Sequence, residues 1–287
     1  MNILVTGSAG MIGSYVVKGL IEKGHTVIGV DRRNNDNVNP DDNRLTQVVL
    51  DLSSKDDVNK VFDEHQIDRC IHLAALAHTK GVADTSWEAF KKVNVDCAEI
   101  LFEACAKHNV PVLFISTVDA IGMVKGLITP ETELNPISNY GKSKAMAEGR
   151  LKEICSQYNI YRFSPVYTED VKRDIQKRYY LKYPDWAYLI GGGQQFEVLN
   201  VRKAVSSMVD WVDKKVDNTI HIIKDEELLD SAKVIAEEKA EGRAKHVLRI
   251  PRWMVVCGYY AIKLVFGKSN KTYLVFKALW PFRTASE

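Results

Sequence analysis

The sequence predicts an α/β fold, a doubly wound parallel sheet with a smaller C-terminal lobe. Apolar, strand-like runs alternate with longer helix-periodic segments through residues 1–166, and a glycine-rich turn joins the first run to the first helical segment. The runs are continuously apolar rather than alternating, so the strands are expected to be covered on both faces. This pattern is typical of Rossmann-type sheets.

The elements can be assigned in chain order. Short apolar runs rich in Val, Ile, Leu or Phe are expected strands, at 3–6, 26–30, 48–50, 70–73 and 110–116. Apolar residues at helical spacing predict helices at 11–22, 56–62 and 88–107. Beyond residue 140 we expect a helix at 142–158, a strand at 160–166 and a late strand at 219–223.

Composition narrows the class of protein. The chain has 287 residues, of which 46% are hydrophobic, and these support one large or two modest domains. A formal charge of +2 argues against a nucleic-acid binder. The five cysteines lack C-x-x-C spacing, so neither a disulfide framework nor a metal site is expected. The first strand starts at residue 2 without a signal-peptide pattern, and we expect a cytoplasmic protein.

The first strand leads into a glycine turn. Gly7, Gly10 and Gly13 form a G-x-x-G-x-x-G pattern with Met11 and Ile12 at the start of the helix. Glycines at a strand-to-helix turn let backbone N–H groups approach a pyrophosphate, so these five residues are predicted to contact a dinucleotide. The alternative is a loop between two core elements.

An acidic residue follows at the distance that a dinucleotide site requires. Asp31 ends the second strand about 20 residues after the glycines, where a carboxylate accepts hydrogen bonds from the adenosine ribose. This favours NAD. Arg32 and Arg33 can meet a 2′-phosphate, so NADP stays open. Asp51, after the third strand, is expected either at the adenine side or in a strand-end turn or helix cap.

Tyr140 and Lys144 lie four residues apart on a predicted helix and therefore share one face. A lysine ammonium lowers the pKa of a neighbouring tyrosine, which can then act as a base. Two other pairs have the same spacing, Tyr259/Lys263 and Tyr273/Lys277, and for these we expect aromatic packing with the lysine stem. Only Tyr140 follows a strand that ends in hydroxyls, Ser116 and Thr117.

Over residues 1 to about 165 the sequence resembles the extended short-chain dehydrogenase/reductase superfamily, specifically its NAD-dependent sugar-nucleotide epimerase/dehydratase family. The motifs that carry the resemblance are Val5–Gly13, Asp31, Asp51-Leu52, His72–Ala75, Val93–Val95, Ser116-Thr117 with Gly122, and Asn139–Lys144. The resemblance implies cofactor contacts at Asp51, Leu52, Leu73, Ala74, Ala75, Asn94 and Ser116. It also implies that Asn94 organises a water chain behind the lysine. His72 is expected to be a core imidazole.

The resemblance further implies a catalytic set of Thr117, Tyr140 and Lys144. Tyr140 would take the proton of a substrate hydroxyl while a hydride leaves the same carbon, Thr117 would hydrogen-bond that oxygen, and Lys144 would hold the nicotinamide ribose. Reduction of the keto intermediate from its other face would be epimerisation. If the cofactor were instead exchanged with solution after each reaction, the same residues would form the site of a dehydrogenase or ketoreductase.

The chain divides into two expected parts. Residues 1–166 form the NAD-binding Rossmann domain, which the late strand near 219–223 joins, and residues 167–287 form mainly a substrate-binding lobe over the strand ends. Three positions depart from the family's pattern. In this lobe Phe196 stands where the family has a diphosphate-binding arginine and Thr168-Glu169 replaces Gly-Pro, and in the first domain Ile121 replaces a tyrosine. Arg202 or the basic run at 172–182, including Arg173, can substitute for that arginine. Solvated surface charge is the alternative.

The last 45 residues are basic and aromatic. Residues 243–287 hold nine Lys or Arg against one acidic residue. Residues 253–266 are too short to span a bilayer, which needs about 20 residues. We expect two short helices packed on the lobe, with contact to a membrane surface as the alternative. Monomer and homodimer both stay open.

Together these observations predict an NAD-dependent epimerase or oxidoreductase acting on a hydroxyl of a small molecule, with a nucleotide sugar as the expected substrate. One alternative is a hydroxysteroid dehydrogenase-like or other ketoreductase acting on an apolar substrate. Another, from a different class, is a non-catalytic dinucleotide-binding regulatory protein. Intact Thr117, Tyr140 and Lys144 argue against the last, because a regulator needs none of them.

Overall fold

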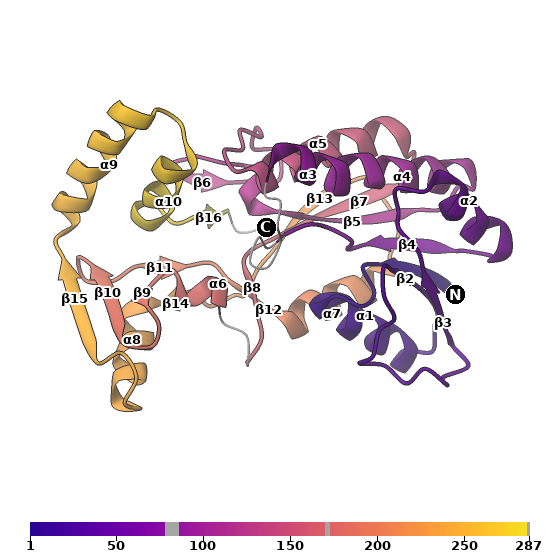
Figure 1. Cartoon of the computed structure of the whole chain (residues 1–287), viewed down its shortest axis with the longest axis horizontal. Coiled ribbons are helices and arrows are strands. Elements are labelled where there is room, and N and C mark those ends of the chain that lie inside the picture. Colours follow the sequence, from indigo (N-terminus) through magenta and orange to yellow (C-terminus); the bar gives the residue numbers. More distant parts are fainter. Residues whose placement is uncertain (78–85, 170–172, 286–287) are drawn as a thin grey trace.

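A seven-stranded parallel sheet forms the centre of the molecule (Figure 1). The structure, a computed structural model, describes residues 1–77, 86–169 and 173–285, without the side chains of residues 173 and 174. Along the sheet the strands run in the order β13 (Ile220–Ile223), β7 (Tyr158–Phe163), β5 (Val112–Thr117), β4 (Arg69–His72), β1 (Asn2–Thr6), β2 (Thr26–Asp31) and β3 (Leu45–Val49). The chain starts at β1 and winds outward in both directions, which confirms the predicted doubly wound fold.

Helices cover both faces of the sheet, as Figure 1 shows. On one face lie α1 (Met11–Glu22) and α7 (Val201–Trp211), and on the other α2 (Lys55–Glu64), α4 (Cys97–Lys107) and α5 (Asn139–Ile154). Successive side chains of β1 pack on opposite faces of the sheet. Ile3 packs in the core beneath α1 and α7, whereas Leu4 packs in the core beneath α2, α4 and α5.

Several boundaries differ from those predicted. Helix α5 begins at Asn139 rather than 142, because the Ser138 hydroxyl accepts a hydrogen bond from the N–H of Gly141 and caps the helix there. Strand β3 begins at Leu45 rather than 48, since it is a partly exposed edge strand without a continuous apolar run. The expected helix 88–107 is three pieces: α3 (Trp87–Lys91), a π-helical turn (Lys92–Asp96) and α4.

The late strand at 219–223 is β13, and it pairs in parallel with β7. Residues 199–223 therefore return to the central sheet after the chain has left it.

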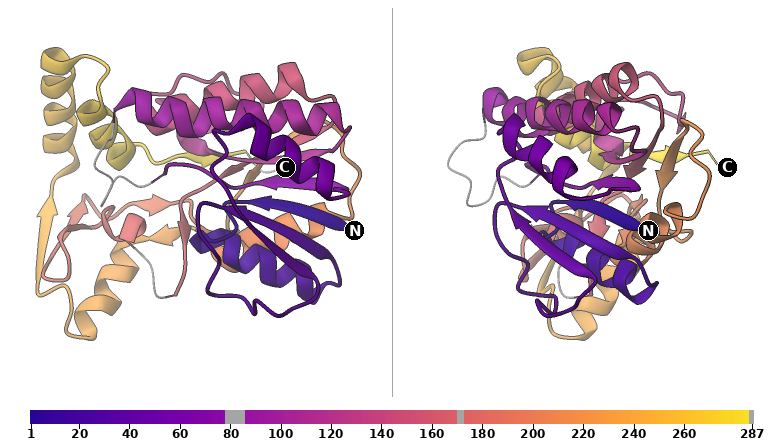
Figure 2. Two further views of the ribbon diagram at one scale, coloured as in Figure 1. Left: turned by 45° about the vertical axis from the view of Figure 1, so that its right-hand side comes forward. Right: turned by 90° about the vertical axis from the view of Figure 1, so that its right-hand side faces the viewer.

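Beyond the carboxyl ends of the strands lies a second group of smaller elements (Figures 1 and 2). Its three-stranded sheet has β10 (Trp186–Ile190) between β9 (Tyr180–Lys182) and β15 (His246–Ile250). Its helices are α6 (Arg173–Gln176), α8 (Ser231–Ala240), α9 (Arg252–Phe266) and α10 (Asn270–Leu279). Three pairs of two-residue strands complete it: β8 (Val166–Tyr167) with β12 (Leu199–Asn200), β11 (Gln195–Phe196) with β14 (Leu229–Asp230), and β6 (Leu127–Ile128) with β16 (Arg283–Thr284).

Candidate active site

The turn between β1 and α1 accepts only glycine at two positions. Gly7 has a φ of +72°, and a Cβ there would lie 2.7 Å from the backbone nitrogen of Ala74. A Cβ on Gly13 would lie 2.0 Å from the carbonyl oxygen of Gly7. The start of α1 therefore touches the turn. Gly10 caps α1 without a side-chain hydrogen bond, so the first N–H groups of the helix face the turn as donors for an anion.

Asp31 lies at the carboxyl end of β2, against this turn. One carboxylate oxygen accepts the N–H of Ala9 at 3.1 Å and the other accepts the N–H of Arg32 at 2.7 Å. The side chain of Arg33 donates to the carbonyl of Ala9 at 3.1 Å, and both arginines are exposed. The carboxylate and the glycine turn thus lie side by side, as a dinucleotide site requires.

A buried asparagine that the sequence analysis missed holds the turn from behind. The side-chain amide of Asn35 donates to the carbonyl of Ser8 at 2.8 Å and accepts from the hydroxyl of Ser14 at 3.1 Å. Its own N–H donates to Gln47 at 2.6 Å. Nothing in the sequence separates Asn35 from the other asparagines of its polar loop.

Asp51 follows β3 and takes part in a turn. Its carboxylate accepts the N–H of Ser53 at 2.9 Å, and this hydrogen bond lowers the pKa of Asp51. Ser54 caps α2. The strand-end turn is therefore present, and contact with adenine stays a prediction, as does the contact at the half-buried Leu52.

The segment after β4 packs against the same turn. Leu73 and Ala74 donate backbone N–H groups to the carbonyl and hydroxyl of Thr6, at 3.1 and 3.4 Å, and Leu73–Ala75 are half-buried. The ring of His72 is 1% exposed and lies 5.7 Å from the rings of Phe102 and Phe114. Burial, together with the charge of Lys144, lowers the pKa of His72 to about 3, so it is the neutral core imidazole that the sequence predicts.

Asn94 lies in the π-helical turn and is 1% exposed. Its side chain accepts the N–H of Leu76 at 2.6 Å and donates to the carbonyl of Leu76 at 3.0 Å and to the hydroxyl of Ser143 at 2.9 Å. Ser143 in turn donates to the carbonyl of Tyr140. Asn94 therefore ties the segment after Ala75 to the first turn of α5. π-Helical turns occur frequently at functional sites.

The start of α5 lies against the end of β5. A Cβ on Gly141 would lie 2.4 Å from the carbonyl oxygen of Asp119, in the short 3₁₀ turn (Val118–Ala120) that follows β5. Thr117, the last residue of β5, accepts the N–H of Asp119 at 3.2 Å. The glycine next to Tyr140 thus allows the helix to approach the turn next to Thr117. The ring of Tyr140 lies 6.4 Å from that of Phe90.

Lys144 is buried one helical turn after Tyr140. It is 2% exposed, and its ammonium lies 4.0 Å from the ring centroid of Phe114 on β5. Burial lowers the pKa of Lys144 to about 7, although the charge of Glu148 opposes that shift. A lysine in this position is poised to change its charge near neutral pH.

The next residue on this face, Glu148, forms a buried ion pair. It binds the guanidinium of Arg162 through two hydrogen bonds, at 3.1 and 2.8 Å, and both side chains are at most 2% exposed. Glu148 also accepts the hydroxyl of Ser116. The Ser116 side chain, predicted to contact the cofactor, is therefore directed to this ion pair in the interior.

The other two Tyr/Lys pairs behave as expected for packing. The ammonium of Lys277 lies 4.4 Å from the ring centroid of Tyr273, and that of Lys263 lies 5.9 Å from the ring centroid of Tyr259. Tyr273 and Lys277 also bind the carboxylate of Asp119, at 3.1 and 3.2 Å. Helix α10 is thus fastened to the turn that follows Thr117.

The candidate anion-binding residues are in different surroundings. Arg202 is 81% exposed in its side chain and pairs with Glu169 at 3.0 Å. Phe196 is buried on β11, and the guanidinium of Arg178 lies 5.1 Å from its ring centroid. Arg173 begins α6, and its side chain lies outside the described part. Arg178, which belongs to the basic run 172–182, therefore lies over Phe196, the position at which the resemblance implies an arginine.

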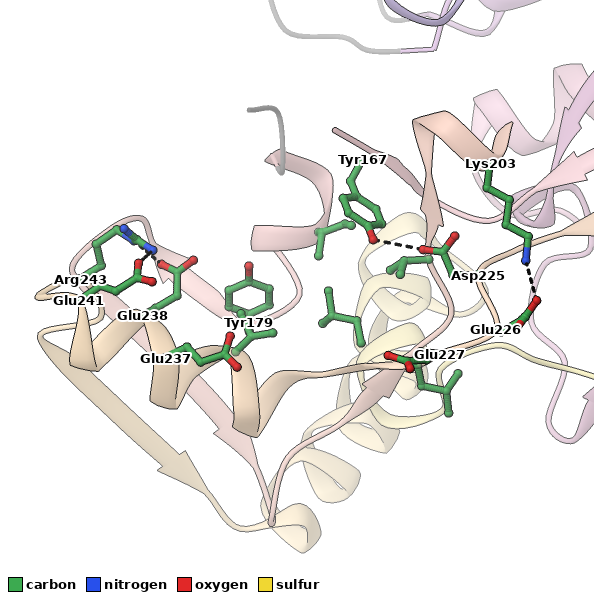
Figure 3. A pocket seen from close by; sticks show the side chains of 15 residues that line it. Tyr167, Tyr179, Lys203, Asp225, Glu226, Glu227, Glu237, Glu238, Glu241 and Arg243 are labelled. Carbon is green, nitrogen blue, oxygen red and sulfur yellow. Dashed lines mark hydrogen bonds and ion pairs between the residues drawn. The ribbon is translucent and has the colours of Figure 1, made fainter. Parts of the chain in front are cut away.

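A cavity of about 590 Å³ lies in the smaller lobe and is strongly acidic (Figure 3). Six carboxylates and two cations, Lys203 and Arg243, line it; the acidic residues are Asp225, Glu226, Glu227, Glu237, Glu238 and Glu241. Figure 3 shows Tyr167 directed at Asp225, a hydrogen bond of 3.2 Å. This cavity repels a diphosphate and includes none of Thr117, Tyr140 and Lys144 among its lining residues.

The predicted cofactor-binding and catalytic residues thus lie mainly along one edge of the sheet, at the carboxyl ends of β1, β2, β3, β4 and β5 and at the start of α5, whereas Arg202 lies at the start of α7. In the described ranges no cluster of three or more His, Cys, Asp or Glu side chains could hold a metal ion. In the same ranges no helix is long and apolar enough to cross a membrane.

The fold and this edge define a Rossmann-type α/β protein. The chain belongs to the NAD dependent epimerase/dehydratase family, whose model matches residues 3–213. This confirms the resemblance read from the motifs.

Individual relatives of the chain are also named as epimerases. An uncharacterised UDP-glucose epimerase of Bacillus subtilis is 29% identical over 196 residues, 61% of this chain and 60% of that protein. The UDP-glucose 4-epimerase of Drosophila melanogaster is 31% identical over 174 residues, 54% of this chain and 48% of that protein. The chain thus spans about half the length of the curated relatives it matches.

Among solved structures, a Thermotoga maritima UDP-glucose 4-epimerase with UDP-glucose is similar with a TM-score of 0.71 and 27% identity, covering 88% of this chain and 86% of that one. A Thermus thermophilus UDP-glucose 4-epimerase complexed with NAD has a TM-score of 0.69 and 26% identity, with the same coverage.

Proposed function

We propose that the protein is an NAD-dependent epimerase or oxidoreductase that acts on a hydroxyl of a nucleotide sugar. The observation that carries this proposal is the buried Lys144, placed one turn after Tyr140 on a helix that touches the turn following Thr117. A buried lysine needs a compensating partner, and two ribose hydroxyls would supply it. The similar epimerases with bound NAD and UDP-glucose support the choice of cofactor and substrate.

NAD fits the residues that are present. A Cβ at Gly7 would lie too close to the backbone of Ala74, and one at Gly13 too close to the carbonyl of Gly7, so glycine allows the tight turn that leaves the first N–H groups of α1 to meet a pyrophosphate. Asp31 would accept the hydroxyls of the adenosine ribose, and Lys144 would donate to those of the nicotinamide ribose. Bound NAD would supply a hydride acceptor that can also return the hydride.

Side chains of the protein would accept the proton of the substrate hydroxyl and bind its oxygen. Tyr140 would accept the proton of the substrate hydroxyl, and Thr117 would hydrogen-bond the same oxygen. The charge of Lys144 would favour the phenolate of Tyr140. Loss of the proton and hydride leaves a keto sugar, and its reduction from the opposite face gives the epimer.

Replacement of Tyr140 by Phe tests the proposed base. We expect Tyr140→Phe to lose turnover of UDP-sugars by at least about 100-fold, since a general base contributes 10²–10⁴-fold, while NAD binding measured by calorimetry stays within a few-fold. Tyr259→Phe is the matched control, because Tyr259 also precedes a lysine by four residues. Turnover by Tyr140→Phe within a few-fold of the unaltered protein would overturn the assignment.

For the substrate diphosphate we propose Arg178. Its guanidinium lies over Phe196 on β11, and its charge acts on both Tyr188 on β10 and Tyr273 on α10, so it lies within the smaller lobe among these three elements. The planar guanidinium of an arginine can donate two parallel hydrogen bonds to phosphate oxygens.

Calorimetry with UDP on the NAD-loaded protein compares Arg178→Ala with Arg202→Ala. We expect Arg178→Ala to weaken UDP binding by at least about tenfold, the loss typical of a charge-assisted pair, and Arg202→Ala to change it less than threefold. The reverse order would transfer the role to Arg202. Absence of UDP and UDP-sugar binding to the NAD-loaded protein would favour a ketoreductase acting on an apolar substrate.

A further inference from the structure

Helix α9 has one apolar face that nothing in the described chain covers. Six exposed and uncharged residues of α9 form this face and recur at intervals of three, four and seven: Trp253, Met254, Cys257, Tyr260, Leu264 and Val265. Leu264 is 89% exposed and Val265 is 72% exposed. This spacing places the six side chains on one side of the helix.

The opposite side of α9 is packed. Val255, Val256 and Tyr259 face the core formed with α10, and the ring of Tyr259 lies 5.1 Å from that of Trp280 and 6.2 Å from that of Phe276. Helix α9 is therefore held in place by one face and presents the other outward. Figure 1 shows it at the end of the molecule farthest from the amino terminus.

Positive charge flanks the carboxyl-terminal end of the apolar face. Lys263, Lys268 and Lys271 are exposed along α9 and the turn into α10, and the ammonium of Lys271 lies 4.4 Å from the ring centroid of Phe266. From residue 244 to 285 the sequence contains no Asp or Glu. An apolar face with aromatic residues and flanking lysines is the composition of a helix that lies in the headgroup region of an anionic bilayer.

We propose that α9 docks the protein on an anionic membrane surface, with its axis parallel to the bilayer. A helix of 15 residues is about 22 Å long, less than the roughly 30 Å of a bilayer's hydrocarbon core, so it lies on the membrane and does not cross it. The face buries its apolar side chains among the acyl chains while the lysines contact lipid phosphates. This inference does not depend on the proposed activity.

The positive charge near α9 also favours a membrane surface over a second copy of the chain as the partner of its apolar face. Two copies joined through α9 would bring the lysines at its carboxyl-terminal end close to their own equivalents in a parallel pair, or close to the exposed Arg252 of the other copy in an antiparallel pair, with no acidic partner on either segment. Like charges at an interface disfavour association, whereas lipid phosphates attract them.

Co-sedimentation with vesicles tests the proposal on the full chain. We expect binding to phosphatidylcholine vesicles that contain 30% phosphatidylglycerol, weaker binding to pure phosphatidylcholine, and loss of most binding at high salt. Leu264→Glu should lower the partition coefficient at least tenfold. Lys263→Gln/Lys268→Gln/Lys271→Gln should lower it by about 100-fold, since each lysine near an anionic surface is worth roughly fivefold.

Matched controls come from elsewhere on the surface. Leu181→Glu changes an exposed leucine on β9, which is 61% exposed, and Lys18→Gln/Lys107→Gln/Lys215→Gln removes the same charge from exposed sites outside α9 and α10. Both should keep the binding within threefold. Thermal unfolding of every variant shows whether its fold is intact.

Cys257 provides a direct measure of insertion. It is exposed on the apolar face, whereas the other four cysteines are buried, so an environment-sensitive fluorophore can be attached there selectively. We expect a blue shift of its emission on anionic vesicles. Absence of both co-sedimentation and a blue shift at low salt would overturn the proposal. A concentration-dependent dimer abolished by Leu264→Glu, without vesicle binding, would assign the face to a second copy instead.

Discussion

The buried ammonium of Lys144 should cost the unliganded protein stability. Methionine has a similar length and no charge, and it can keep the contact with the ring of Phe114, which lies 4.0 Å from the lysine nitrogen. We therefore expect Lys144→Met to be more stable than the unaltered protein in the absence of NAD, although it should lose activity.

The size of the effect follows from the pKa. A fall in the pKa of Lys144 from 10.5 to about 7 corresponds to about 5 kcal/mol, at ~1.4 kcal/mol per tenfold change in proton affinity. The unfolded chain binds the proton more tightly, so stability rises with pH between about 7 and 10.5. The loss of unfolding free energy caused by the buried ammonium has its full value below pH 7 and falls to about 1.4 kcal/mol at pH 9.5.

The assay is urea unfolding of both proteins at pH 6.5 and 9.5, without NAD. Lys144→Met should be more stable by several kcal/mol at pH 6.5, and the difference should shrink by about 3 kcal/mol at pH 9.5. Lys142→Met is the matched control, because Lys142 is exposed on the same helix and should show neither effect.

Saturating NAD should reduce the difference in stability, since NAD binds more tightly to the protein that keeps the ammonium and stabilises it more. If Lys144→Met is equally or less stable at pH 6.5, or if the difference does not depend on pH, the buried ammonium is not the cause and the reasoning fails.

Two further predictions concern the cofactor. Asp31→Ala should weaken NAD binding and improve the relative use of NADP, because the carboxylate repels the 2′-phosphate of NADP, which the exposed Arg32 can bind. Titration of both proteins with NAD and with NADP tests this. If the unaltered protein already prefers NADP, the role of Asp31 is contradicted. Gly13→Ala should destabilise the protein by about 1–3 kcal/mol and abolish NAD binding, since its Cβ would lie 2.0 Å from the Gly7 oxygen. Gly149→Ala, with nothing within 4 Å of its Cβ, should instead stabilise α5 by up to about 1 kcal/mol, as unfolding in urea would show.

Regular, local patterns made most of the fold predictable. The parallel strands are continuous apolar runs, and the glycine turn and Asp31 lie at the expected ends of β1 and β2. Strand β3 was the least accurate, because a partly exposed edge strand with the sequence Leu-Thr-Gln-Val-Val has no long apolar run. The helical spacing of residues 88–107 gave no sign of the π-helical turn around Asn94, which depends on contacts with distant segments.

The arrangement of the candidate site was predictable where one motif contains the residues concerned. Tyr140 and Lys144 share a helix, so their spacing was sufficient to place them on one face. The Ser116 hydroxyl binds Glu148, 32 residues further along the chain, and sequence separation conceals such contacts. The position of Arg178 over Phe196 likewise depends on tertiary packing between β11 and the turn that follows α6, which no local pattern encodes.

The return of residues 199–223 to the central sheet has a consequence for how the protein is made. During synthesis, β7 emerges with an unpaired edge, and the face of α1 that α7 later covers stays open until Trp211 and β13 follow. Such an edge is a template for wrong pairing. A fragment that ends at residue 166 would keep this open edge permanently, so we expect it to aggregate, and the nascent chain must delay closing its sheet until residue 223 has left the ribosome.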